Sequence, residues 1–130
     1  MKPRSRILAE HEAAHAVVAR HFGLPVVEIV LGRSSGHTLV DFGPAELWQR
    51  AVVTAAGDLF NKEQGTVPYE DYGCGDLRDF ERDHGLSQLW DAQRAARSVL
   101  KQRREAVVRL ADQLMRTPLL RYDEHGQLRR

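Results

Sequence analysis

Two histidines, His11 and His15, stand four positions apart, and a glutamate, Glu12, follows the first of them. In an α-helix such a pair lies on one face, about 5.4 Å apart along the axis. Both imidazoles can then bind one zinc ion at roughly 2.0–2.1 Å. Glu12 points about 100° away around the helix, so it can reach a water bound to the ion but not the ion itself. The pattern predicts a zinc hydrolase site; core histidines beside a solvated glutamate are the alternative.

The flanking sequence predicts the helix that this chemistry requires. We expect it to run from about residue 4 to residue 22 and to end at Gly23, with Pro25 preventing its continuation. Its inner face repeats at steps of three and four residues. The members of that face are Ile7, Leu8, His11, His15, Val18 and Phe22.

The rest of the chain predicts a mostly helical α+β fold. Residues 26–31 and 37–42 are expected to form a β hairpin, and a second helix should follow Gly43 and Pro44. We expect an irregular connection over 61–75, a short helix from Asp76, and a long C-terminal helix capped by Ser87 that ends near residue 116. The tail, 119–130, is predicted to be partly ordered at best. The inner positions of the two longer helices are Trp48, Ala51, Val52, Ala55, Leu59 and Phe60 in the first, and Ala96, Val99, Leu100, Val107, Leu110 and Leu114 in the second.

Length and composition predict one domain over residues 1–130. Nineteen basic and 18 acidic residues give a net charge of +1, so no global charge marks a nucleic-acid or membrane-surface binder. No stretch approaches the roughly 20 apolar residues that span a bilayer. Cys74 is the single cysteine, which excludes an internal disulfide and agrees with a reducing compartment. The N-terminal residues do not form a signal peptide, and we expect a cytoplasmic protein.

A catalytic zinc ion normally has a third protein ligand. Asp76 is the preferred candidate, because the glycines of Gly73-Cys74-Gly75 would let the backbone fold tightly and deliver its carboxylate at the start of a helix; a plain N-cap is the alternative reading. The metzincin pattern fails, since Val18 replaces its glycine and His21 stays on the helix. The remaining alternatives are Glu46, Glu63, His84 and, as a weaker possibility, Cys74 itself.

The order of these features resembles the peptidase domain of the FtsH-type ATP-dependent zinc metalloproteases. The similarity comprises the His11–His15 motif, the hairpin, an alanine-rich helix, Gly-x-x-Asp-Leu at 73–77 and a long closing helix. It implies a zincin-like fold, zinc ligation by His11, His15 and Asp76, and Glu12 as general base. Ala14 replaces the glycine usual in that family, the aspartate segment is one residue shorter, and a Gly-x-x-x-x-Gly-Lys phosphate loop is absent.

These features predict a zinc metallopeptidase that cleaves peptides or unfolded protein segments. Whether a separate ATPase or adaptor supplies the substrate is left open. A catalytically silent, zinc-stabilised binding module is the second hypothesis, and the oligomeric state is left open. Nucleic-acid binding through Arg94, Arg97, Lys101 and Arg104 is a third, and the better explanation of that stripe is a solvated helix face. We therefore expect neither a nucleic-acid nor a membrane partner.

Overall fold

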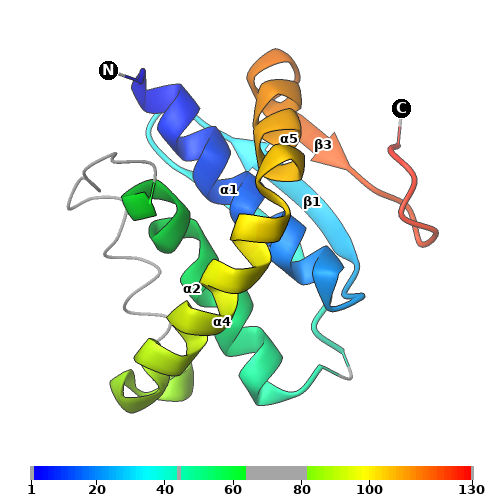
Figure 1. Cartoon of the computed structure of the whole chain (residues 1–130). Helices are drawn as coiled ribbons and strands as arrows, with labels where there is room; N and C mark the ends of the chain where they lie inside the picture. Colours follow the sequence, from blue (N-terminus) through cyan, green and yellow to red (C-terminus); the bar gives the residue numbers. More distant parts are fainter. Residues whose placement is uncertain (1, 44, 64–81, 130) are drawn as a thin grey trace.

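The computed structural model describes residues 2–43, 45–63 and 82–129. Three long helices and one shorter helix pack with a small antiparallel sheet (Figure 1). This agrees with the predicted mostly helical α+β class. The elements in chain order are α1 (Arg4–His21), β1 (Val26–Leu31), β2 (Gly36–Val40), α2 (Leu47–Glu63), the 3-10 turn η1 (Leu86–Gln88), α4 (Leu89–Gln102), α5 (Arg104–Arg116) and β3 (Leu119–Arg121).

Helix α1 is the centre of the fold. It was predicted to bury one face, yet every residue from Ile7 to Ala19 is buried. Five alanines among these residues let α2, α5 and the sheet approach the helix from different sides. The helix ends as predicted, because Gly23 adopts a φ of +73° and the Leu24 amide bonds back to the Ala19 carbonyl at 3.0 Å.

One buried charge on α1 is balanced by Lys2, which precedes the helix, and by Arg6 in its first turn. The Glu10 side chain is only 3 % exposed and accepts hydrogen bonds from Lys2 at 2.8 Å and Arg6 at 3.4 Å. Arg6 also bonds Asp112 on α5. Glu10 needs its two partners because a buried carboxylate is costly without them. The Arg6–Asp112 pair also ties the start of α1 to α5.

The sheet has the order β2-β1-β3, and all its pairs are antiparallel. The predicted hairpin is confirmed as β1 and β2, although β2 ends at Val40 and not at residue 42. A bulge between Val26 and Glu28 shifts the register of this pair. Because the strand order is β2-β1-β3, β2 lies at one edge of the sheet; it also contacts α1.

Strand β3 comes from the tail, for which the sequence predicted little order. Leu120 pairs with Ile29 and is 1 % exposed, so burial of its side chain fixes the strand. On the outer face, Arg121 bonds Glu28 at 2.9 Å and His37 lies 3.0 Å from the same carboxylate. These two partners, His37 first, hold the pKa of Glu28 below its ordinary value.

The predicted long C-terminal helix is two helices. The chain leaves helical geometry at Arg103, with φ of −116° and ψ of 23°, and changes direction there (Figure 1). The break lets α4 cover α2 while α5 covers α1, which one straight helix would not do. No glycine or proline marks it in the sequence. Ser87 was also wrongly predicted as the cap: Gln88 is the N-cap, and its side chain makes no capping bond.

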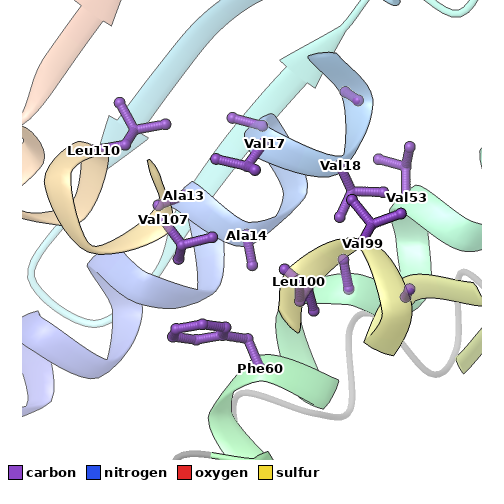
Figure 2. Close-up of a cluster of buried hydrophobic side chains, with 14 of the residues drawn as sticks. Ala13, Ala14, Val17, Val18, Val53, Phe60, Val99, Leu100, Val107 and Leu110 are labelled. Carbon is purple, nitrogen blue, oxygen red and sulfur yellow. The ribbon is translucent and has the colours of Figure 1, made fainter. Parts of the chain in front are cut away.

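The core lies where α1, α2, α4 and α5 meet (Figure 2). Figure 2 shows Phe60, Leu100 and Val107 close to the alanine face of α1. The six inner positions predicted on the C-terminal helices are all buried, as are those of α2 except Trp48, which is 47 % exposed. Helix α2 extends three residues into the segment predicted as irregular. No helix in the described part of the chain combines the length and apolarity needed to cross a membrane.

Candidate metal centre

The two imidazoles of the motif face each other inside the protein. His11 is 5 % exposed and His15 is 8 % exposed, and their Nε2 atoms are 3.2 Å apart. The ring planes are nearly perpendicular, at 81°. Two ligands of a tetrahedral zinc ion at 2.0–2.1 Å would stand about 3.3 Å apart. The observed separation of the two nitrogens therefore fits a zinc ion held between them.

A hydrogen bond on the far side of His15 directs its Nε2 lone pair toward His11. The Nδ1–H group of His15 donates to the Val53 carbonyl of α2 at 2.7 Å. A carbonyl can only accept, so in the neutral ring the proton lies on Nδ1 and the lone pair on Nε2. This is the arrangement that metal-binding histidines usually have.

Helix α2 supplies the corresponding groups for His11. The Asn61 amide nitrogen lies 3.3 Å from His11 Nδ1, and an Asp58 carboxylate oxygen lies 3.6 Å from it. Asn61 is 1 % exposed, and its buried Oδ1 has no hydrogen-bond partner among the described residues. A half-turn of the amide would let Oδ1 accept the Nδ1–H proton. That rotation satisfies the orphaned oxygen and leaves the Nε2 lone pair of His11 available for a metal.

Gly57 lets α2 come close to both rings. A Cβ atom at this position would lie 2.6 Å from His11 Cε1, His11 Nε2 and His15 Nε2. Only glycine leaves room for the imidazoles at this crossing of α1 and α2. The Gly57 backbone and the Nε2 atoms of His11 and His15 therefore lie close together in one small region.

Glu12 lies beside strand β2 and is 5 % exposed. The Thr38 hydroxyl is 2.8 Å from its Oε1 and 3.0 Å from its backbone carbonyl oxygen. A Cβ at Gly36 would come within 3.2 Å of the Glu12 side chain, so the strand leaves space for it. The carboxylate is therefore positioned by Thr38 and by the space at Gly36 of β2.

The structure brings together His11 and His15 but does not test the third ligand. Asp76 and Cys74 lie outside the described residues. Within the described ranges no cluster of three potential metal ligands occurs. Glu63 bonds Arg97 of α4 at 2.5 Å, and His21 is exposed and accepts a bond from Arg103 at 3.2 Å, so neither belongs to the imidazole pair.

Sequence reasoning missed five contributors to this centre: Val53, Gly57, Asp58, Asn61 and Thr38. Gly57 had a usable signal, because a glycine inside an alanine-rich helix indicates close approach of another group. Asn61 was placed at the start of the irregular connection; its position on the last turn of α2 directs it toward His11. Thr38 carried no signal, since threonine is common in strands.

Comparison of the sequence with protein-family models and with curated proteins found no match to either.

Proposed function

We propose that this protein is a zinc-dependent metallopeptidase that hydrolyses amide bonds in peptides or unfolded protein segments. The observation that carries the proposal is the pair of buried Nε2 atoms 3.2 Å apart. His11 and His15 would hold the ion, and Asp76 would be its third ligand. The resemblance to FtsH-type peptidase domains supports the same assignment.

Glu12 acts as general base and then as general acid in this proposal. Zinc, when bound, supplies Lewis-acid activation of the carbonyl and acidifies a water molecule. The Glu12 carboxylate takes the proton of that water and returns it to the departing amine. Thr38 restrains Glu12 through the 2.8 Å hydrogen bond, which limits the rotamers that the carboxylate samples. Burial of both imidazoles keeps bulk water from competing for their nitrogens.

Strand β2 is the element that would bind the substrate. It is the edge of the sheet, so along one side its backbone groups pair with no other strand in the described part of the chain. An extended peptide can add to such an edge through main-chain hydrogen bonds, with little demand on sequence. Thr38 of this strand holds Glu12, so the substrate would lie beside the catalytic carboxylate.

A zinc-stabilised binding module without turnover is the second candidate. It is favoured by the hydrogen bond from the Thr38 hydroxyl to Glu12 Oε1, which engages one oxygen of the required base. In that case the metal contributes folding energy and Glu12 is a structural residue.

Zinc content and peptide cleavage, measured together, separate these candidates. We expect about one zinc per chain in the wild type and in Glu12→Gln, and loss of zinc in His11→Ala and Asp76→Ala. Hydrolysis of an unfolded protein substrate should occur in the wild type and fall by about 10²- to 10⁴-fold in Glu12→Gln. His21→Ala is the matched control, because His21 lies on the same helix but is exposed; it should keep both properties.

Two results would count against the proposal. A wild-type protein that binds no zinc after reconstitution would leave His11 and His15 as core histidines. A protein that binds zinc through His11 and His15 but cleaves no peptide would favour the binding module.

A further inference from the structure

A pocket of about 440 Å³ lies between the C-terminal turn of α2 and the C-terminal part of α4. This volume falls within the range of about 300–1,000 Å³ that ligand sites usually have. It shares no residue with the candidate metal centre. Its lining residues are Phe60, Glu63, Arg97, Leu100, Lys101 and Arg104.

The pocket carries an excess of positive charge. Three cationic side chains and one carboxylate line it, whereas the whole chain has a net charge of only +1. The carboxylate, Glu63, is bonded to Arg97. Lys101 is exposed, and no hydrogen bond or ion pair joins its ammonium group to another described residue. An anionic ligand would complement this charge.

The cations follow one another along the pocket, which favours a ligand with several negative charges over a single small anion. Arg97 and Lys101 are four residues apart on α4, so they stand about 6 Å apart along its axis. Arg104, the first residue of α5, lines the same pocket. Side chains on one face of an extended peptide repeat at about 6.6–7 Å. Two carboxylates separated by one residue would therefore meet neighbouring cations.

Apolar atoms form the floor of the pocket. Phe60 and Leu100 are 2 % and 5 % exposed and belong to the main core (Figure 2). They are rigidly packed, so the floor is preformed and offers contact to an apolar group placed beside the charges.

Peptide chemistry fits this site better than other polyanions. Glu63 can accept a hydrogen bond from a peptide N–H, a donor that a phosphodiester backbone lacks. No exposed aromatic ring lines the pocket for base stacking, since its one aromatic residue, Phe60, is buried. A lipid surface would need exposed apolar side chains beside the cations, and the apolar residues that line this pocket, Phe60 and Leu100, are buried.

We propose that this pocket and its cations bind an acidic peptide segment that carries an apolar side chain beside its carboxylates. The segment lies along α4, with its carboxylates on Arg97, Lys101 and Arg104 and its apolar side chain over Phe60 and Leu100. This binding does not depend on zinc or on catalysis.

The test is fluorescence anisotropy with a labelled eight-residue peptide of alternating glutamate and leucine. We expect saturable binding that weakens roughly tenfold in Lys101→Glu and in Arg97→Glu, because reversal of a charge at the site adds repulsion. Arg109→Glu is the matched control: Arg109 is also exposed and paired to a glutamate, but it lies on α5 outside the pocket. It should change the affinity less than about twofold.

Two further ligands test the stated chemistry. Replacement of the glutamates by glutamine should abolish binding, and replacement of the leucines by serine should weaken it severalfold. The proposal is overturned if the glutamate-leucine peptide does not bind at millimolar concentration, or if Lys101→Glu and Arg109→Glu behave alike. Preferential binding of single-stranded RNA, lost in Lys101→Glu, would also overturn it. Thermal unfolding of each variant checks that the fold is retained.

Discussion

Replacement of Gly57 by alanine should destabilise the native protein but stabilise a variant that lacks His11 and His15. In the native protein the new methyl group would lie 2.6 Å from three imidazole atoms, which is about 0.8 Å inside ordinary contact. Overpacking of this kind costs about 1–3 kcal/mol. Alanine gains up to about 1 kcal/mol over glycine in a helix interior. The net loss should therefore be up to about 2 kcal/mol.

In a His11→Ala/His15→Ala background the same methyl group meets no imidazole. Only the helix-propensity term remains, so Gly57→Ala should there stabilise the protein by up to about 1 kcal/mol. The propensity term cancels between the two backgrounds, so the coupling between position 57 and the histidine pair should be about 1–3 kcal/mol. Urea unfolding followed by circular dichroism measures all four proteins.

The substitution should also abolish zinc binding in the otherwise native protein. A shift of the two Nε2 atoms by several tenths of an ångström exceeds the tolerance of about 0.2 Å for zinc–ligand distances. Gly43→Ala is the control glycine variant, because its Cβ would meet only the exposed Asp41 carboxylate, at 3.2 Å. If Gly57→Ala kept full stability and zinc content, the close crossing of α1 and α2 described above would be refuted.

Three further predictions concern the base, the sheet and the core. Thr38→Val should leave zinc content unchanged and lower kcat about tenfold, because it removes a hydrogen bond to the Glu12 carboxylate. Thr38→Ser keeps the hydroxyl and should retain most of the rate. An unchanged kcat in Thr38→Val would contradict the idea that Thr38 positions Glu12. Glu28 has a lowered pKa in the folded state. Its contribution to stability is therefore complete above its unfolded pKa near 4.5 and is lost as the pH falls through the folded pKa. Glu28→Gln should make the free energy of unfolding less dependent on pH in this acidic range, which urea unfolding at successive pH values measures. Leu114→Ala should destabilise the protein by about 2–5 kcal/mol in the same assay, because the side chain is 0 % exposed, and a loss below about 1 kcal/mol would place Leu114 outside the core.

Much of the fold follows from local sequence signals. Gly23 and Pro25 predict the end of α1. A run of β-branched and aliphatic residues, followed by a glycine-serine turn, predicts the β1–β2 hairpin. The periodic apolar residues of α2, α4 and α5 identify most of the core, because a helix that packs by one face must repeat with its own period. Trp48 follows that period but is largely exposed, since it lies near the start of α2.

The break at Arg103 and strand β3 had no such signals. Helix propensity is favourable through residues 100–106, so only the need to cover two differently oriented partners explains the change of direction between α4 and α5. Strand β3 has three residues, too few for a periodic pattern, and it is stabilised by pairing with β1 about ninety residues earlier in the chain.

The same division holds for the candidate metal centre. The sequence by itself determines that His11 and His15 share one side of a helix, because their spacing matches the helical repeat. Only the tertiary structure places Val53 and Asn61 of α2 beside the Nδ1 atoms of the imidazoles and Gly57 against their Nε2 atoms. It also places Thr38 of β2 against Glu12. These residues lie 26 to 50 positions from their partners, a separation over which packing, and not local periodicity, decides which side chains meet.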